Sequence, residues 1–256
     1  MLLFDYDGVL LNSVVEMGVT AYNSATGQLI TAPEQMPGNA AGLFLTNRYH
    51  VQPAGDAITL MAWIVAHADL APDHRLSPEE YRSIKDSADT PLIERTAHFF
   101  ATRRKFVEHD PIQWRALNSV YHPLWDILCE KGAHRVVILT NKNREATLTL
   151  CHHFGLAIPA ENVYSGDNSV TKIENMLQIH DRFKRESYTF VDDSVGNLNE
   201  LDAYFNPERQ MLRMDLASWG YTGPEDELLA AKAGYRYITQ DDLIHRLDAE
   251  LPAGVT

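Results

Sequence analysis

The chain has 256 residues, of which 45% are hydrophobic, and this length suits one large domain or two unequal ones with a substantial buried core. The formal net charge of −13 argues against a nucleic acid as partner, because binding to a phosphate backbone requires a basic surface. No apolar run approaches the roughly 20 residues of a membrane-spanning helix. The N-terminus lacks the basic region of a signal peptide, so we expect a cytoplasmic protein that does not bind a membrane.

The first four residues, MLLF, predict a short buried strand, because the run is continuously apolar and a glycine-containing turn follows it. Asp5 and Asp7 come directly after this run, and Gly8 follows them. In a parallel sheet, the carboxyl ends of the strands form the edge where ligands bind. The alternative is an Asx-type turn in which the aspartates bind only their own backbone.

Residues 15–117 predict a helical domain that is inserted after this first strand. Helical periodicity or helix-start signals occur at residues 14–27, 57–70, 77–85 and 91–107, and stretches rich in proline and glycine separate them. We therefore expect one domain built from residues 1–14 and 118–256, and a second built from residues 15–117. A helical domain inserted at this point could cover a ligand at the edge of the sheet.

From residue 121 onward, strand-like and helix-like segments alternate. Apolar runs predict strands at residues 135–140, 188–193, 210–216 and 235–239, and helical patterns occur at 123–132, 144–155, 172–183 and 224–234. This alternation is typical of an α/β fold, here a Rossmann-like parallel sheet with helices on both faces. The two cysteines, Cys129 and Cys151, have no metal-ligand spacing, which is typical of free thiols in a reducing compartment.

Polar residues end the predicted strands or begin the helices that follow. Thr140 and Asn141 end one strand, Asp192 and Asp193 end another, and Lys172 begins the helix between them. A helix N-terminus can bind an anion, and carboxylates bind divalent metals. Together these groups predict a site for a phosphoryl group and a metal ion.

The chain resembles the phosphatase branch of the haloacid dehalogenase superfamily. The segment DYDGVL is similar to the first motif of that family, LTN to the second, the isolated Lys172 to the third and VDDSVGN to the fourth, in the same order. The long helical insertion after the first motif resembles the type I cap of the family. The resemblance implies Mg²⁺ as cofactor and a small phosphorylated metabolite as substrate.

The resemblance also implies the roles of the acidic residues. Asp5 would be the nucleophile that forms an aspartyl-phosphate, and Asp7 would protonate the leaving alkoxide and then take a proton from water. The ligands of Mg²⁺ would be Asp5, the backbone carbonyl of Asp7, and Asp193. A dehalogenase expels halide, which needs no proton, so the acid at Asp7 favours phosphoryl transfer.

The remaining motif residues would bind phosphate or lie around the metal ligands. Lys172 would hold Asp5 and the phosphoryl oxygens, since a carboxylate and a phosphate repel each other by about 4 kcal/mol per unit pair at 4 Å. Thr140 and Asn141 would bind phosphate, although both residue types also favour helix caps. Asp192 and Asn197 stand where many family members carry glycine and a second acid, so we expect them to surround the metal ligands rather than to bind the metal.

Several other residues have weaker assignments. Lys142 follows Asn141 directly and is expected to point away from the site. Among the arginines of the helical insertion, Arg48 is the preferred candidate for substrate selection, because it lies in an irregular stretch rather than on a helix face. Trp219 and Tyr221 are interpreted as packing residues beyond a strand.

The motifs leave more than one function open. A Mg²⁺-dependent phosphatase fits them best. A phosphomutase of the β-phosphoglucomutase type would use the same four motifs, and a protein that only binds a phosphorylated ligand is a third alternative. The sequence does not separate a monomer from a homodimer.

Overall fold

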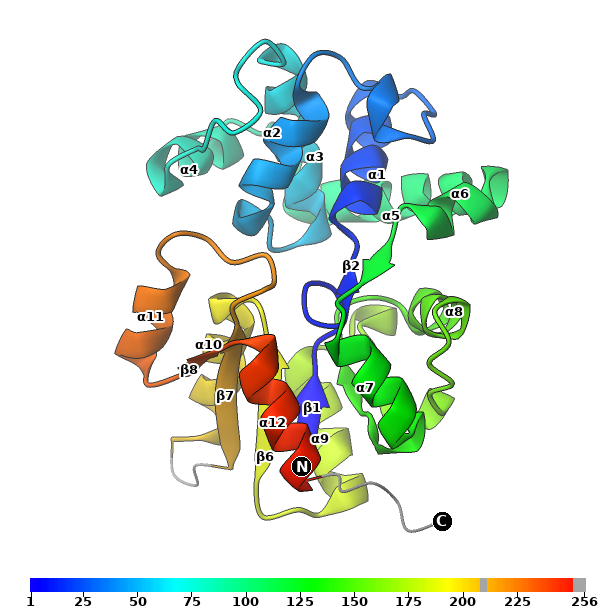
Figure 1. Cartoon of the computed structure of the whole chain (residues 1–256). Helices are drawn as coiled ribbons and strands as arrows, with labels where there is room; N and C mark the ends of the chain where they lie inside the picture. The colour runs from blue at the N-terminus through cyan, green and yellow to red at the C-terminus, as the bar shows by residue number, and fades with distance from the viewer. Residues whose placement is uncertain (208–210, 251–256) are drawn as a thin grey trace. The chain divides into compact units, whose positions relative to one another are not determined.

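The computed structural model describes residues 1–207 and 211–250. It contains two compact units, one formed by Met1–Asn12 with the chain from Val120 onward and the other by Ser13–Ser119. Each boundary lies two residues from the one expected from the sequence. Figure 1 shows the elements of both units by their labels.

The unit that contains both ends of the chain is built on a six-stranded sheet in the order β5-β4-β1-β6-β7-β8. All the strand pairs in this sheet are parallel, which confirms the α/β fold expected from the sequence. The strands are β1 (Leu2–Phe4), β4 (Ile138–Leu139), β5 (Val163–Tyr164), β6 (Tyr188–Asp192), β7 (Leu212–Ala217) and β8 (Arg236–Ile238).

The strands differ in detail from those expected. Only two of the six residues at 135–140 form β4, and β5 was not expected at all, because a two-residue strand has no readable periodicity. The first residue of the expected strand at 210–216 lies outside the described residues. Two further short strands, β2 (Leu11–Asn12) and β3 (Ser119–Val120), form a separate two-stranded sheet.

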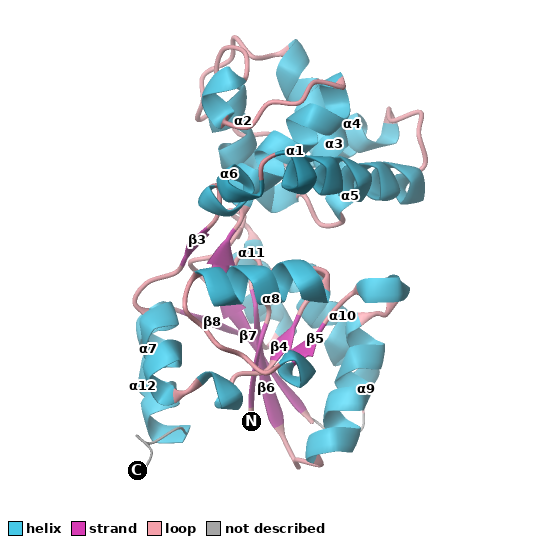
Figure 2. Ribbon diagram, turned by 90° about the vertical axis from the view of Figure 1, so that its right-hand side faces the viewer, coloured by secondary structure: helices cyan, strands magenta, loops and turns pink. Residues whose placement is uncertain are grey.

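Helices cover both faces of the six-stranded sheet (Figure 2). On one face lie α9 (Lys172–Phe183) and α10 (Val195–Phe205), and on the other lie α7 (Leu124–Lys131) and α12 (Gln240–Glu250). The other helices of this unit are α8 (Arg144–His153) and α11 (Asp226–Ala233).

The alternation of side chains along each strand explains these two layers. Tyr188 and Phe190 of β6 belong to the buried cluster that also contains Met176 and Ile179 of α9. Asp215 of β7 has no exposed surface, and it accepts hydrogen bonds from two arginines, Arg236 of β8 and Arg246 of α12. This buried carboxylate therefore ties α12 to the sheet.

The second unit is helical. It contains α1 (Val14–Thr26), α2 (Ala40–Asn47), α3 (Ala54–Ala66), α4 (Pro78–Asp86), α5 (Leu92–His109) and α6 (Pro111–Ala116). The helices α2 and α6 were not among the expected segments. A buried ion pair joins α1 to α5, because the guanidinium of Arg103 donates two hydrogen bonds, of 2.9 and 2.7 Å, to the carboxylate of Glu16. Arg103 is therefore a structural residue of this unit.

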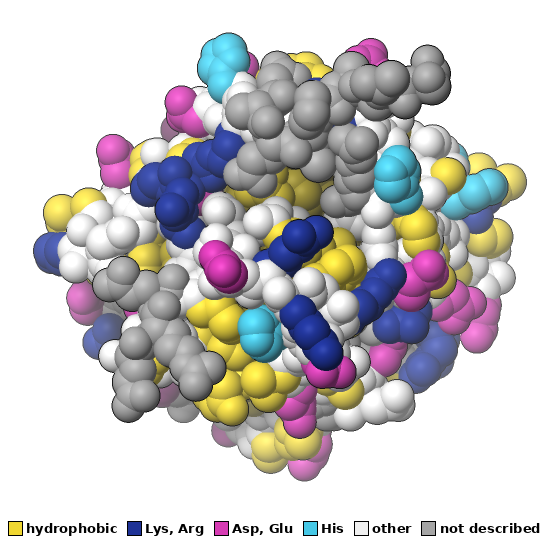
Figure 3. Space-filling view, turned by 90° about the horizontal axis from the view of Figure 1, so that it is seen from below, with side chains coloured by type: hydrophobic (Ala, Val, Ile, Leu, Met, Phe, Trp, Pro, Cys, Tyr) yellow, Lys and Arg dark blue, Asp and Glu magenta, His cyan; other side chains and the backbone are white. Residues whose placement is uncertain are grey.

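The amino ends of the strands lie at the face drawn in Figure 3, where basic and acidic side chains are interspersed with apolar ones. Within the described parts of the chain, the structure has no helix with the length and apolar character needed to cross a membrane.

Candidate active site

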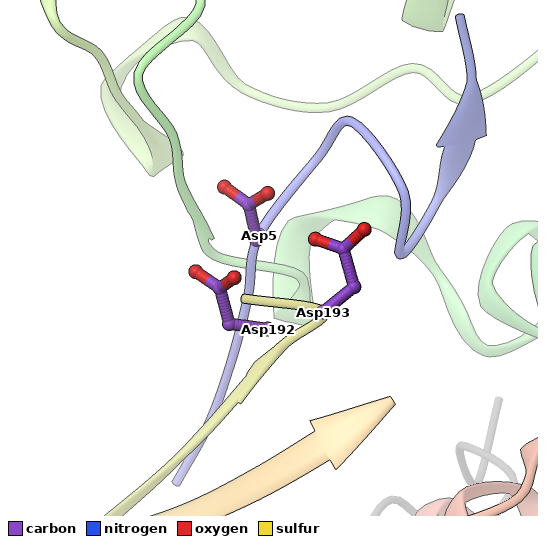
Figure 4. Close-up of side chains that lie close together, drawn as sticks. All are labelled: Asp5, Asp192 and Asp193. Atoms are coloured by element: carbon purple, nitrogen blue, oxygen red, sulfur yellow. The ribbon is translucent and has the colours of Figure 1, made fainter. Parts of the chain in front are cut away.

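The register of the sheet brings two predicted site residues together at its carboxyl edge. Phe4 of β1 is paired with Val191 of β6, and the backbone N–H of Asp5 donates to the carbonyl of Val191 at 2.8 Å. Asp5 and Asp192 are therefore the next residues on two adjacent strands, and Asp193 follows. Figure 4 shows the three carboxylates projecting beyond the ends of β1 and β6, and each offers one oxygen within 4.8 Å of the others.

Lys172 lies between two of these carboxylates. Its ammonium Nζ is 2.9 Å from Oδ1 of Asp5 and 2.5 Å from Oδ2 of Asp192, and its side chain is only 2% exposed. Lys172 is the first residue of α9, which begins with a capping box formed by Thr171 and Glu174. This cap fixes where α9 starts, and so it fixes where the lysine enters the site.

Burial and charge shift the pKa values of this pair. Burial raises the pKa of Asp5 well above its ordinary value of 3.8, and the charge of Lys172 opposes this shift only in part. Burial by itself would lower the pKa of Lys172, but the carboxylates of Asp192 and Asp5 outweigh it and raise that pKa. The lysine therefore keeps its charge at neutral pH, while the ionised form of Asp5 is costly unless further positive charge is present.

Asp193 is held by a loop that the sequence assigned only to packing. Its Oδ2 accepts a hydrogen bond of 2.6 Å from the backbone N–H of Tyr221. In the same loop, the indole N–H of Trp219 donates to the carbonyl of Val9 at 3.0 Å. These contacts connect the end of β7 to both the turn after β1 and the carboxylate of Asp193, and no sequence motif indicated them.

Gly8 leaves room for the carboxylate of Asp193. Its φ is +92°, which disfavours other residues, and a Cβ atom at this position would lie 2.0 Å from Oδ2 of Asp193. The glycine of DYDG is therefore required twice, once for the backbone turn and once for the close approach of the carboxylate.

Asp192 is surrounded by hydrogen-bond donors. Besides Lys172, it accepts hydrogen bonds from the backbone N–H of Ser194 at 2.8 Å and from the side-chain amide of Asn197 at 3.1 and 3.0 Å. Asn197 thus contacts Asp192 and orients it. Both oxygens of Asp192 are used in these contacts, so Asp192 can help to hold Lys172. That Asp192 lies beside the metal ligands without binding the metal itself stays a prediction.

Thr140 and Asn141 lie beyond β4, and they have different surroundings. Thr140 is 1% exposed, its backbone N–H donates to the carbonyl of Tyr164, and its hydroxyl oxygen accepts from the N–H of Lys142 at 3.1 Å. Asn141 is exposed. Neither residue caps α8, because Asn143 is the cap and accepts from the N–H of Ala146 at 2.7 Å.

Contrary to expectation, Lys142 points into the site. Its Nζ lies 3.0 and 3.3 Å from the two carboxylate oxygens of Asp7. The expectation compared Lys142 with Asn141, its direct neighbour. The chain bends at Asn141 and Lys142, however, and the hydroxyl of Thr140 accepts the N–H of Lys142, so this turn sets the direction of the lysine.

Arg48 belongs to the helical unit. It begins a short 3₁₀ turn, Arg48–His50, and its guanidinium donates to the carbonyl of Val51 at 2.6 Å. Arg48 is partly buried, whereas Arg104, another arginine of this unit, is exposed on α5. The role of Arg48 in substrate selection stays a prediction.

The donor set at the carboxyl edge fits Mg²⁺. This ion prefers oxygen ligands and uses one or two carboxylates together with water and substrate oxygens. Asp5, Asp7, Asp192 and Asp193 carry four negative charges when ionised, and Lys142 and Lys172 carry two positive ones. One divalent cation would balance these six groups. Asp5, Asp192 and Asp193 are close enough together to hold such an ion, and the ligand set expected from the sequence, Asp5, Asp193 and the backbone carbonyl of Asp7, stays a prediction.

Comparisons of sequence find no relative. No protein-family model matches the chain, and no curated protein matches it.

Solved structures, by contrast, match over nearly the whole chain. A predicted phosphoglycolate phosphatase from Haemophilus somnus 129PT has a TM-score of 0.58 at 14% identity, with 96% of each chain covered. A predicted phosphatase from Clostridium acetobutylicum has a TM-score of 0.54 at 15% identity, also with 96% of each chain covered. Protein tyrosine kinase A from Mycobacterium tuberculosis has a TM-score of 0.50 at 14% identity, over 87% of this chain and 86% of that one. The chain has the fold of these predicted phosphatases, and this fold is the one that the resemblance to the haloacid dehalogenase superfamily led us to expect.

Proposed function

We propose that this protein is a Mg²⁺-dependent phosphatase of the haloacid dehalogenase superfamily, which hydrolyses a small phosphorylated metabolite through an aspartyl-phosphate on Asp5. The observation that carries the proposal is the buried group at the carboxyl edge, where Lys172 lies between Asp5 and Asp192 and Asp193 lies alongside. A nucleophilic carboxylate beside a fixed ammonium and further metal-binding oxygens is the equipment that phosphoryl transfer requires.

In the first half of the reaction, a carboxylate oxygen of Asp5 attacks phosphorus and the bond to the leaving alkoxide breaks. Asp7 donates the proton that the alkoxide needs. Lys172 keeps Asp5 oriented and offsets part of the repulsion between the carboxylate and the phosphate. Mg²⁺, when bound, would supply the remaining positive charge.

In the second half, water attacks the phosphorus of the aspartyl-phosphate. Asp7, now deprotonated, takes the proton from this water, and the bond between phosphorus and Asp5 breaks to release inorganic phosphate. Both roles of Asp7 require its carboxyl group to face the same point in space, where the alkoxide leaves and the water enters.

The test is a panel of phosphomonoesters with Mg²⁺, with EDTA, and with the variant Asp5→Asn. We expect phosphate release by the wild type in Mg²⁺, its loss in EDTA and its loss in Asp5→Asn. Asp181→Asn is the matched control, because Asp181 is an exposed aspartate of α9. It should retain full activity.

Other outcomes of the same panel would point to the alternatives. Conversion of a sugar phosphate into its isomer without phosphate release would indicate a phosphomutase. Binding of a phosphomonoester without any turnover would indicate a ligand-binding protein, and it would contradict the proposed function.

A further inference from the structure

Lys142 makes a buried contact with the carboxylate of Asp7. Both oxygens of Asp7 lie within hydrogen-bond range of Nζ, at 3.0 and 3.3 Å. The side chain of Lys142 is 2% exposed, whereas that of Asp7 is 21% exposed. The lysine is therefore sealed from solvent, while the carboxylate that it holds remains partly accessible.

The backbone around Lys142 directs the lysine to this position. The hydroxyl of Thr140 accepts the N–H of Lys142 at 3.1 Å, and this contact closes a tight turn directly after β4. Phe4 of β1 is paired with Ile138 of β4, so the turn that carries Lys142 and the turn that carries Asp7 leave neighbouring strands. Thr140 and the sheet register together set the direction of the lysine.

A buried ammonium group needs a partner, because removing it from water without one is costly. Lys142 forms an ion pair with Asp7, and Lys172 forms ion pairs with Asp5 and Asp192. The two aspartates of DYD are thus held by different lysines that come from different elements.

We propose that Lys142 is a positioning residue, which fixes the carboxyl group of Asp7 at the point where the leaving alkoxide takes its proton. The inference rests on the proposed function. A general acid must lie within about 3 Å of the oxygen that it protonates, so an Asp7 side chain that is free to rotate would spend part of its time out of reach. Contact with both of its oxygens sets the plane of the carboxyl group, and the side chain of Asp7 remains 21% exposed.

The experiment compares Lys142→Met, Lys142→Arg and Asp7→Asn on phenyl and alkyl phosphates whose leaving groups differ in pKa. If Lys142 acts through Asp7, Lys142→Met should lower kcat by about 10- to 100-fold for alkyl phosphates, the range expected when a charge-assisted hydrogen bond is lost. It should lower kcat little for p-nitrophenyl phosphate, whose leaving group needs no proton. Lys142→Arg should restore part of the loss.

The double variant Asp7→Asn, Lys142→Met provides a second readout. It should be no slower than Asp7→Asn alone, because the lysine has nothing left to position. The inhibition constant of inorganic phosphate should be the same in Lys142→Met and the wild type. A crystal structure of Lys142→Met should show the carboxyl group of Asp7 turned from its present position.

Three results would overturn the inference while the wild type remains an active phosphatase. These are an equal loss of kcat by Lys142→Met on all substrates, losses that multiply in the double variant, or a weaker inhibition by phosphate, which would make Lys142 a phosphate ligand. If the wild type releases no phosphate from any substrate, the proposed function itself fails.

Controls separate positioning from folding. Lys232→Met, at an exposed lysine of α11, should behave as the wild type. Circular dichroism and the unfolding midpoint show whether Lys142→Met is folded. If it is not, Lys142→Gln replaces it in the same series, with the same expected results.

Discussion

Asp5 and Asp7 are separated by one residue, yet they have different surroundings. The side chain of Asp5 is 9% exposed and contacts Lys172, whereas the side chain of Asp7 is 21% exposed and contacts Lys142. Tyr6 between them has no exposed surface and points away, with its hydroxyl near Cys151. A buried nucleophile and a more accessible acid are compatible with the roles proposed for them.

The raised pKa of Asp5 predicts that its ionised carboxylate destabilises the folded state. A carboxyl group with a higher pKa in the folded state binds its proton more tightly there, so its contribution to stability falls as pH rises from its unfolded value. Because Asp5 is shifted upward from 3.8, this loss begins near that pH and is complete above the raised pKa. In EDTA at pH 7, Asp5→Asn should therefore have a higher free energy of unfolding than the wild type.

Urea titrations at several pH values measure this difference. It should shrink as the pH falls toward 3.8, and Mg²⁺ should stabilise the wild type but not Asp5→Asn. An Asp5→Asn variant that is less stable than the wild type at pH 7 in EDTA would show that Lys172 overcomes the cost of burying Asp5.

Gly8 offers a second prediction for a single residue. In Gly8→Ala, the strain of the left-handed backbone should lower the free energy of unfolding by about 1 to 2 kcal/mol. The value of kcat should fall by about 100-fold or more, since the added Cβ would displace Asp193. Gly155→Ala is the matched control, because Gly155 has a φ of +86° and no atom within 4 Å of the added Cβ. It should lose the same stability and keep its activity. Full activity in Gly8→Ala would show that the position of Asp193 is not critical.

At the scale of elements, the sequence predicted the parts of the site that follow regular patterns. The strands β1 and β6 are apolar runs that end in aspartates, and Lys172 begins a helix whose cap is visible as Thr171 and Glu174. The loop after β7 could not be predicted in this way. It acts through the backbone N–H of Tyr221 and the indole of Trp219, and a backbone donor leaves no trace in the residue types.

The contribution of the loop after β7 to the site can be tested at Trp219. Trp219→Phe removes the donor to the carbonyl of Val9, which should cost about 1 to 3 kcal/mol of stability. Because the same loop holds Asp193, the variant should also need more Mg²⁺ for half-maximal activity. Trp63→Phe, in the helical unit, is the control and should leave the Mg²⁺ requirement unchanged. An unchanged requirement in Trp219→Phe would mean that Tyr221 holds Asp193 without help from the indole.

At the scale of the whole molecule, the chain contains a sheet unit that carries every residue proposed for the chemistry and a helical unit that carries none of them. The insertion was visible in the sequence because about a hundred residues of helical pattern interrupt the strands. The sequence did not show which residues of the helical unit select a substrate. An exposed arginine that binds substrate stands in the same kind of sequence as an arginine that contacts only solvent. All phosphomonoesters carry the same phosphate group, and a metal ion in the site would contact only that group. Selectivity therefore requires contacts to the rest of the substrate.

Arg48 is the residue on which this can be tested. Arg48→Ala should raise KM for the preferred substrate by a factor that corresponds to about 1.5 to 3 kcal/mol of binding free energy, the contribution of a hydrogen bond to a charged group. The KM for p-nitrophenyl phosphate should stay unchanged. Arg104→Ala, at an exposed arginine of α5, is the control and should change neither value. If both substrates respond equally to Arg48→Ala, selection belongs to another residue.

If Asp5 carries the phosphoryl group during turnover, the aspartyl-phosphate can be trapped on it. Wild-type enzyme mixed with its best substrate and Mg²⁺ is quenched in acid, reduced with borohydride and digested, and the peptide that contains Asp5 is analysed by mass spectrometry. Borohydride reduces an acyl phosphate to an alcohol, so we expect homoserine in place of Asp5, and none when substrate is omitted. An unmodified Asp5 in an enzyme that turns over under the same conditions, or homoserine at another aspartate, would show that Asp5 is not the nucleophile.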